Sequence, residues 1–333
     1  MTTDSPDPRR PVFEVDGLEV RFRTGEGVAR AVNGISFSVH PGERVAVVGE
    51  SGCGKSASLL AALRLLPSPP AQVAGRVLLD GTDLFALNAR ELNDVLGRDV
   101  AMVFQDSLSS LNPVLRMGRQ ITEGVRRHEG LSKKDARAYA TELLTRVGVP
   151  DPAQRVDQYP HQLSGGMRQR AMIAMALAGK PKLLIADEPT TALDVTVQAQ
   201  ILDLVRGLED VAIVWVSHDL GVVAGLADRV LVMYAGYIIE EGDVGSVFHR
   251  PRHPYTRGLL NSVPSFRDAD RSRLAAIPGL PPTLTDLPAG CPFYDRCELR
   301  EPRCSAQMPP LTTVDGTQRA ACWVTAAPLE VAS

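Results

Sequence analysis

Hydrophobic and polar positions alternate in the first part of the chain. Residues 13–22 and 35–39 follow this period of two. Alternation places every second side chain on one face of a strand, so it predicts antiparallel strands with one buried face. We therefore expect an antiparallel β subdomain near the start of the sequence.

Later hydrophobic runs are continuous. They lie at residues 44–48, 183–186, 211–216 and 230–233. Continuous runs of this length are typical of strands buried on both faces of a parallel sheet. Hydrophobic residues at helical spacing separate the runs, at residues 56–66, 195–208 and 220–227. Strands that alternate with helices in this way predict an α/β fold.

The pattern changes in two other regions. Residues 106–168 contain no strand-like run, and residues 132–147 carry hydrophobic side chains at helical spacing after Ser132, a suitable N-cap. This predicts a helical insertion. From about residue 250 proline and arginine become frequent and the periodicity fades. We therefore expect a main domain at residues 12–250 and a loop-rich C-terminal extension at residues 251–333.

The composition restricts the class of protein. The chain has 333 residues, of which 44% are hydrophobic and 23% charged, with a net charge of −3. At roughly 150 residues per domain, this length predicts about two domains. The mildly acidic balance argues against nucleic acid as a partner. No hydrophobic run approaches the ~20 residues that cross a bilayer, and the first residues lack the apolar core of a secretory signal. We therefore expect a protein that could dock on a membrane but does not span one.

A glycine-rich loop follows the run at residues 44–48. The sequence Gly49-Glu-Ser-Gly-Cys-Gly-Lys-Ser56 fits G-x-x-x-x-G-K-[ST] and precedes a predicted helix. Such a loop turns its backbone N–H groups inward around phosphate, and the helix N-terminus adds partial positive charge. Lys55 is expected to reach the β- and γ-phosphates and Ser56 to ligate Mg²⁺. The nucleotide-binding residues predicted in this loop are Gly49, Ser51, Gly52, Cys53, Gly54, Lys55 and Ser56.

Two acidic residues end the run at residues 183–186. Asp187 is placed to hold Mg²⁺, directly or through water, and Glu188 to orient and deprotonate an attacking water. A solvated acidic turn would have the same sequence, so this prediction depends on the Lys55 loop.

A second anion-binding feature is expected about a hundred residues after the glycine-rich loop. Ser164, Gly165 and Gly166 begin a predicted helix whose first N–H groups have no partner within the helix. Taken alone, these three residues fit a simple helix cap better than an anion site.

In this order the motifs resemble those of the ATP-binding cassette (ABC) ATPases, the nucleotide-binding subunits of transporters. The resemblance spans residues from about 12 to 250. The glycine-rich loop is similar to the Walker A motif, residues 163–167 to the signature motif, and Asp187 with Glu188 to the Walker B motif. The resemblance implies a P-loop NTPase core, ATP and Mg²⁺ as ligands, and ATP hydrolysis.

The resemblance also adds residues outside these motifs. Gln105 resembles the Q-loop glutamine, which contacts Mg²⁺ and couples to the membrane subunit. Asp194 resembles the aspartate of the D-loop, residues 192–194, and His218 the switch histidine that contacts the γ-phosphate. Phe22 is positioned like the aromatic residue that stacks on adenine, although a core position would explain it equally well. Catalytic roles are therefore expected for Glu188, His218 and Gln105.

The resemblance narrows to one group of transporters. Segments similar to peptide and nickel importer ATPases lie at residues 104–113, 159–170, 253–256, 277–282 and 290–297. Such a subunit lies on the cytoplasmic face of the cell membrane. It pairs with a homologous second ATPase, two membrane permeases and an extracytoplasmic binding protein, with ATP sandwiched between two cassettes. Uptake of di- or oligopeptides is implied.

Several alternatives stay open. The cargo could instead be nickel, glutathione or another small solute, and the dimer could be a homodimer. A cytosolic ABC ATPase without a transport role is a further alternative. The single cassette, without heptads or a basic tail, disfavours it.

Cysteines concentrate in the extension, at Cys291, Cys297, Cys304 and Cys322. Structural disulfides are not expected in a chain without a secretory signal, so clustered cysteines indicate metal binding. The spacing C-x5-C-x6-C-x17-C lacks the C-x2-C pairs of zinc ribbons, and four thiolates could hold a [4Fe–4S] cluster or Zn²⁺. Some members of the resembled family carry an iron–sulfur cluster here, which favours the cluster. Zinc or no metal are the alternatives.

Overall fold

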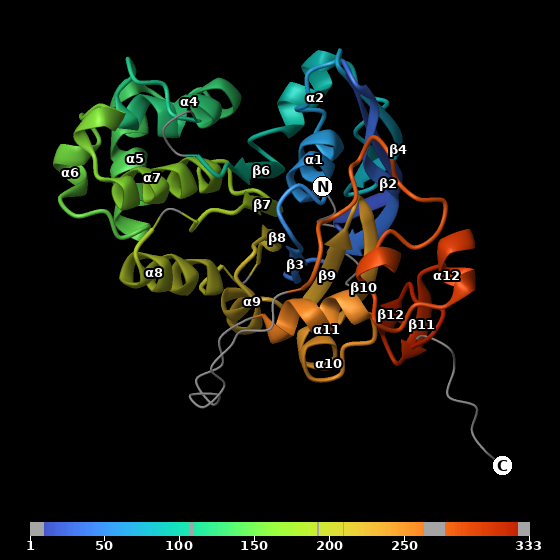
Figure 1. Ribbon diagram of the computed structural model, residues 1–333. Helices are drawn as coiled ribbons and strands as arrows, with labels where there is room; N and C mark the ends of the chain where they lie inside the picture. Colours follow the sequence, from blue (N-terminus) through green and yellow to red (C-terminus); the bar gives the residue numbers. More distant parts are fainter. Residues whose placement is uncertain (1–9, 107–109, 192, 209, 263–276, 326–333) are drawn as a thin grey trace. The chain divides into compact units, whose positions relative to one another are not determined.

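The computed structural model describes residues 10–106, 110–191, 193–208, 210–262 and 277–325 (Figure 1). The chain forms two compact units. The first comprises Met1–Phe13, Ser38–Glu43 and Leu78–Val216, and the second Glu14–Phe37, Arg44–Val77 and Ser217–Ser333. The domain boundary expected at residues 250/251 stays a prediction.

The first unit contains a parallel sheet. Its strands are β6 (Val100–Val103), β7 (Leu183–Asp187) and β8 (Ala212–Val216). Ile185 of β7 pairs with Met102 of β6 and with Val214 of β8. Every residue of β7 and β8 is buried. The α/β fold expected from the continuous hydrophobic runs is therefore confirmed.

Helices make up the segment between β6 and β7. They are α4 (Met117–Glu129), α5 (Lys133–Arg146), α6 (Pro152–Arg155), η1 (Pro160–Gln162) and α7 (Gly165–Leu177). The hydroxyl of Ser132 accepts a hydrogen bond from the Asp135 N–H at 3.3 Å and so caps α5. Helices α4, α5 and α7 pack against one another (Figure 1). The remaining elements of this unit are β5 (Thr82–Asp83), α2 (Ala89–Val95) and α8 (Val195–Arg206).

The second unit begins with three neighbouring strands. They are β1 (Phe13–Thr24), β2 (Gly27–Val39) and β4 (Ala71–Leu79), in the order β2-β1-β4. The two-residue connection makes β1 and β2 antiparallel, as expected. The alternation shifts at Gly17, whose φ of +58° lets Val15 and Leu18 both point into the core.

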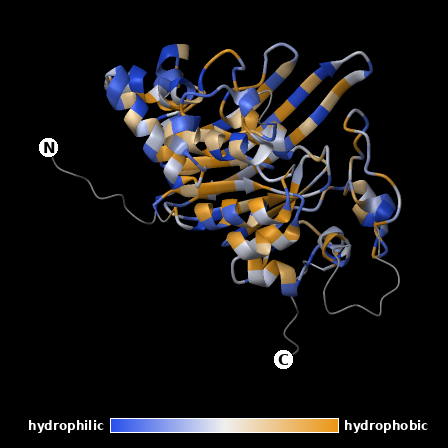
Figure 2. Ribbon diagram, turned by 90° about the vertical axis from the view of Figure 1, so that its left-hand side faces the viewer, coloured by the Kyte–Doolittle hydropathy of each residue, from blue (hydrophilic) through white to orange (hydrophobic). Residues whose placement is uncertain are grey.

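A second set of strands lies in the same unit. They are β3 (Arg44–Val48), β9 (Arg229–Tyr234), β10 (Tyr237–Asp243), β11 (Thr312–Asp315) and β12 (Gln318–Ala320). β3 runs parallel to β9, and β9, β10, β12 and β11 follow as antiparallel neighbours. Hydrophobic residues run along the strands in Figure 2. The extension expected to be loop-rich therefore adds two short strands to a sheet.

The second unit also contains helices. They are α1 (Lys55–Ala62), α9 (Leu220–Leu226), α10 (Val244–His249), α11 (Pro254–Asn261), η2 (Tyr294–Arg296) and α12 (Pro302–Ala306). Of these, α9 packs on β3 and α10 packs on β9 and β10. None of the helices in the described part of the chain is long and apolar enough to cross a membrane.

Aromatic rings join the extension to the sheet. The ring of Tyr234 at the end of β9 lies 4.6 Å from that of Tyr255 and 5.4 Å from that of Phe293. All three side chains are buried, and Cys291 and Cys304 belong to the same hydrophobic cluster. The extension thus shares a core with β9.

Candidate active site

The glycine-rich loop packs tightly within the second unit. Gly49 has φ +153°, and a Cβ there would lie 2.2 Å from the carbonyl oxygen of Met233 in β9. Gly54 has φ +105°, and a Cβ there would lie 2.3 Å from the carbonyl oxygen of Ala31 in β2. A side chain at either position would displace backbone, so the two glycines are required by the close approach of these strands.

Lys55 points back across its own loop. It is the first residue of α1 and only 5% exposed. Its ammonium donates hydrogen bonds to the carbonyl oxygens of Gly49 at 2.8 Å and Glu50 at 3.0 Å. An ammonium beside a helix N-terminus gives this loop the positive charge that an anion requires.

The other predicted residues of the loop differ in exposure. Ser51 and Gly52 are exposed, Ser56 is half-buried, and Cys53 is buried. Burial raises the pKa of the Cys53 thiol, and the nearby Lys55 offsets part of that shift. Cys53 is therefore a protonated thiol at neutral pH.

Glu188 and Gln105 meet in the first unit. The Glu188 carboxylate accepts hydrogen bonds from the Gln105 amide at 3.2 Å and from the Thr191 hydroxyl at 3.0 Å. Glu188 has φ +45° and precedes Pro189, a conformation that few residues other than glycine adopt. Its N–H donates to the Val216 carbonyl oxygen at 3.1 Å. Strained backbone of this kind concentrates at functional sites.

Asp187 is the last residue of β7 and is 6% exposed. Its Cα pairs with that of Val216 in β8. A carboxylate this deeply buried needs hydrogen-bond donors or a cation, because desolvation disfavours the charged form.

Ser164 caps α7 with its own hydroxyl. The oxygen accepts a hydrogen bond from the Met167 N–H at 3.3 Å, so the helix-cap interpretation of this residue holds. Asp194 caps α8 in the same manner, accepting from the Val197 N–H at 2.9 Å. A Cβ on Gly166 would lie 3.0 Å from the Val197 side chain. The first turns of α7 and α8, including the exposed Gly165, therefore lie side by side.

His218 and Phe22 belong to the second unit. His218 is exposed and follows Ser217, whose N–H donates to the carbonyl oxygen of Val47 in β3 at 3.2 Å. His218 thus lies near the end of the strand that leads into the glycine-rich loop. Phe22 is half-buried near the end of β1. Of the predicted D-loop, Ala192 lies outside the described residues.

The four cysteines of the extension are close together. Cys291, Cys297, Cys304 and Cys322 line one cavity of about 20 Å³, together with His253 and Phe293. All four are free thiols, and burial raises the pKa of Cys291 to about 12. Within the described ranges, no group of three or more histidine, cysteine or acidic side chains could hold a metal ion as placed. The cysteines therefore gather as expected, whereas the metal stays a prediction.

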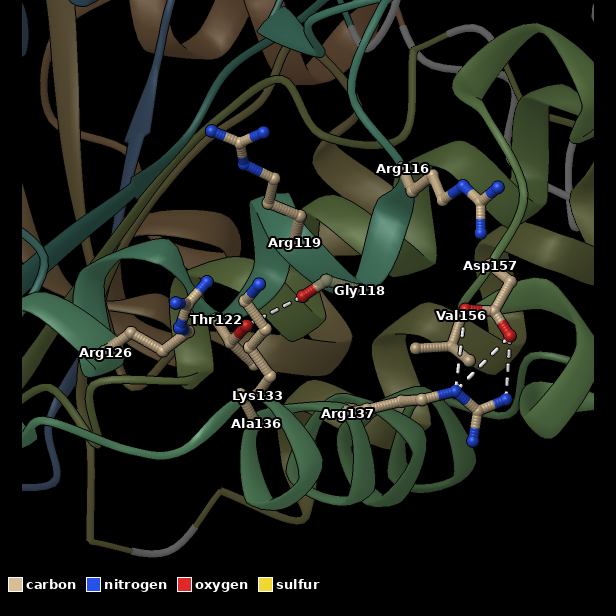
Figure 3. A pocket seen from close by; sticks show the side chains of 10 residues that line it. All are labelled: Arg116, Gly118, Arg119, Thr122, Arg126, Lys133, Ala136, Arg137, Val156 and Asp157. Carbon is tan, nitrogen blue, oxygen red and sulfur yellow. Dashed lines mark hydrogen bonds and ion pairs between the residues drawn. The ribbon is translucent and has the colours of Figure 1, made fainter.

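A basic pocket lies on the helical part of the first unit. It has a volume of about 670 Å³ and is lined by α4, α5 and residues 156–157 (Figure 3). Its cationic side chains are Arg116, Arg119, Arg126, Lys133 and Arg137. Arg137 pairs with Asp157 at 2.7 Å, which holds the pKa of that carboxyl below its usual range. The pocket therefore carries a large net positive charge. The sequence analysis did not select it, because the residues contribute to it from two helices and a loop.

Two other residues that the sequence analysis did not select contact the glycine-rich loop. Tyr255 accepts a hydrogen bond from the Glu50 N–H, and Arg296 pairs with the Glu50 side chain. Both lie in segments that resemble the importer ATPases, residues 253–256 and 290–297, but nothing in those segments predicted a contact with the loop.

Family models match two parts of the chain. A model described as ABC transporter matches residues 32–191, and one described as oligopeptide/dipeptide transporter, C-terminal region, matches residues 239–304. The second match includes Tyr255, Arg296 and three of the four clustered cysteines; only Cys322 lies beyond it.

Similar proteins are peptide transport subunits by name. The oligopeptide transport ATP-binding protein OppD of Bacillus subtilis is 49% identical over 317 residues, which cover 94% of this chain and 88% of OppD. The dipeptide transport ATP-binding protein DppD of the same organism is 48% identical over 317 residues, which cover 94% of each chain.

Solved structures of ABC cassettes are similar in fold. The ATP-binding cassette MJ0796, in a dimeric post-hydrolysis state bound to ADP and Pi, has a TM-score of 0.63 and 27% identity, covering 70% of this chain and 98% of that chain. The cbiO1 protein of Clostridium perfringens, part of the ABC transporter complex cbiONQ, has a TM-score of 0.58 and 28% identity, covering 72% of this chain and 91% of that chain. With about half of its residues identical to the peptide transport subunits along nearly its whole length, the chain belongs to the ABC transporter ATPases.

Proposed function

We propose that this ATPase powers the import of di- or oligopeptides through a membrane permease. The observation that carries the proposal is the match of residues 239–304 to the C-terminal region of oligopeptide and dipeptide transporters, in a chain similar to OppD and DppD throughout. The same relatives favour peptides over nickel, glutathione or another small solute as cargo, and favour transport over a non-transport role.

The glycine-rich loop binds the phosphates of ATP in this proposal. Loop N–H groups, including those of Ser51 and Gly52, surround the phosphates, and Lys55 exchanges its carbonyl partners for β- and γ-phosphate oxygens. Mg²⁺, when bound, would supply positive charge that stabilises the phosphates during hydrolysis. By family resemblance Ser56, Gln105 and Asp187 hold this ion, and the burial of Asp187 is consistent with a cationic partner.

Glu188 orients and deprotonates the attacking water. The hydrogen bonds from Gln105 and Thr191 to its Oε2 support this role, because they fix the carboxylate in one orientation. His218 contacts the γ-phosphate, and Phe22 stacks on the adenine.

A second ATPase subunit completes the assembly. Ser164, Gly165, Gly166 and Asp194 contact the nucleotide of that subunit, which is a homologous chain or a second copy of this one. The dimeric state of the cassette MJ0796 supports the arrangement.

The permease docks in the basic pocket. Its five cationic side chains face only one acidic lining residue, Asp157, which Arg137 already neutralises. An acidic segment of the membrane subunit complements this charge. Docking there places the chain at the cytoplasmic face of the membrane, where a binding protein on the opposite side delivers the peptide.

The clustered cysteines hold a [4Fe–4S] cluster, with Zn²⁺ as the alternative. Support comes from the proximity of the four thiols and from their chemistry, which suits either group once they are deprotonated; the cavity of about 20 Å³ that they line would have to widen to hold a cluster. Anaerobically purified protein that absorbs near 400 nm favours the cluster. Colourless protein with one equivalent of zinc favours the alternative, and metal-free protein contradicts both.

Reconstitution tests the transport function. The chain is combined in proteoliposomes with a permease pair, the second ATPase subunit and a binding protein, and uptake of labelled peptides is measured with and without ATP. We expect ATP-dependent uptake that the Lys55→Ala variant abolishes. Uptake of nickel or glutathione but not of peptides would contradict the proposed cargo.

A further inference from the structure

The side chain of Glu50, the second residue of the glycine-rich loop, is held by an arginine of the extension. Arg296 Nη1 donates to Glu50 Oε2 at 2.8 Å, and Arg296 Nη2 donates to Glu50 Oε1 at 2.9 Å. The Arg296 side chain is 5% exposed and that of Glu50 is 27% exposed. A two-bond pair of this kind fixes orientation as well as distance, which a lysine could not do.

Other groups hold the guanidinium of Arg296 independently of Glu50. Its Nε donates to the carbonyl oxygen of Pro278 at 2.9 Å, and Nη1 donates to the Tyr234 hydroxyl at 3.2 Å. Its central carbon lies 5.8 Å from the ring of Tyr234 and 5.7 Å from that of Phe293. These contacts hold the guanidinium of Arg296 in one position, from which it binds the Glu50 side chain of the loop.

The extension also holds the backbone of Glu50. The Glu50 N–H donates to the Tyr255 hydroxyl at 2.8 Å, and the Tyr255 side chain is completely buried. Lys55 donates to the carbonyl oxygen of the same residue. The position of Glu50 therefore determines the path of the loop and one of the two carbonyl groups that Lys55 contacts.

We propose that Arg296 and Tyr255 are positioning residues for nucleotide binding, which act through Glu50 to keep the glycine-rich loop in its phosphate-binding conformation. The proposal rests on the proposed function only in assigning that loop to ATP. Neither residue touches the reacting atoms, so both act on ATP affinity more than on the hydrolysis step. A loop already held in its binding conformation loses less conformational freedom when the ligand arrives.

A purely structural role makes a different prediction. If Arg296 only attaches the extension to the sheet, its loss lowers the stability of the chain but leaves the ATP affinity of the folded molecules unchanged. The affinity of the folded fraction and the ratio of KM to kcat therefore separate the two roles.

The test uses the full chain and a fluorescent ATP analogue with Mg²⁺. We expect Arg296→Gln to raise Kd and KM about tenfold, which corresponds to about 1.4 kcal/mol, with kcat changed less than about twofold. Arg296→Lys keeps the positive charge but not the pair of hydrogen bonds to Glu50, so it should recover part of the affinity. Tyr255→Phe removes one hydroxyl from an intact ring and should raise Kd by a smaller factor. Arg300→Gln, at an exposed position four residues along, is the matched control.

A double-variant cycle identifies the route. If Arg296 acts through Glu50, the Kd of the double variant Glu50→Gln/Arg296→Gln is no higher than the larger of the two single-variant Kd values. Fold-increases in Kd that multiply in the double variant would overturn the positioning role. An unchanged Kd in folded Arg296→Gln and Tyr255→Phe would overturn it as well. Normal binding by Lys55→Ala would instead refute the assignment of the loop to ATP, so the two failures are distinguishable.

Discussion

Gln105 donates a hydrogen bond to the carboxylate of Glu188 across 83 positions of sequence. The two residues follow neighbouring parallel strands, because Val103 of β6 pairs with Ala186 of β7. The carboxyl ends of parallel strands meet at one edge of a sheet, where α/β proteins place their ligands. The amide thus fixes the carboxylate that we propose as the general base.

Replacing this carboxylate should remove hydrolysis. We expect Glu188→Gln to lower the ATPase rate about 10²- to 10⁴-fold, the usual contribution of a general base, and His218→Ala to lower it substantially as well. Phosphate release measures the rate. Glu142→Gln makes the same chemical change at an exposed position of α5 and should be active. Near-normal turnover in both site variants would contradict the mechanism.

A methyl group at Gly54 should distort the loop. The Gly54→Ala variant adopts an unfavourable φ and brings its Cβ against the Ala31 carbonyl oxygen, so we expect a lower Tm and at least tenfold weaker ATP binding. Thermal unfolding and analogue titration check both effects. Gly245→Ala, where the added atom meets open space, is the control. Equal behaviour of the two variants would exclude the steric argument.

Charge reversal in the basic pocket should prevent assembly. We expect the Arg116→Glu/Arg119→Glu variant to lose co-purification with the permease subunits, since an acidic segment would then be repelled. Arg146→Glu, an exposed residue of α5 that does not line the pocket, should assemble normally. Unimpaired assembly of the pocket variant would place the permease elsewhere.

His253 should make the chain sensitive to acid. It is 1% exposed, its Nδ1 accepts from the Tyr255 N–H at 3.0 Å, and burial lowers its pKa from 6.5 to about 3. Between these values the unfolded chain binds the extra proton, so stability falls as the pH falls. The loss is about 2 kcal/mol from pH 7 to pH 5.

Urea unfolding at pH 7 and pH 5 measures this contribution. His253→Asn keeps a helix-capping acceptor without the titration, so we expect its stability to change less between the two pH values. The exposed His249→Asn variant should retain the wild-type dependence. Burial raises the pKa of the neighbouring Glu240, which acts in the opposite direction at lower pH, so the variants are compared at the same pH values. An identical pH dependence in His253→Asn would contradict the prediction.

Strong local patterns made much of the fold predictable. The run at residues 183–186 became the buried strand β7, and the helical spacing after Ser132 became α5. The strands β11 and β12 were missed because each is only three or four residues long, β12 depends on pairing with β10, and β11 depends on pairing with β12. Their stability comes from a partner strand that no local periodicity records.

The site was predictable to the extent that its residues follow strands. Gln105 and Glu188 could be placed because each ends a hydrophobic run. The left-handed backbone of Glu188 could not, since it is imposed by the turn before Pro189 and the hydrogen bond to Val216. The pairing of Glu50 with Arg296 could not be predicted either, because two charged residues 246 positions apart carry no signal of contact.

That separation has a consequence for synthesis on the ribosome. At about 5–20 residues per second, roughly 12 to 50 s pass between translation of Glu50 and translation of Arg296. During this interval a nascent chain carries the complete glycine-rich loop without the guanidinium that supports it. With the positioning role proposed for Arg296, a nascent chain would gain its full affinity for nucleotide only after residue 296 has been translated.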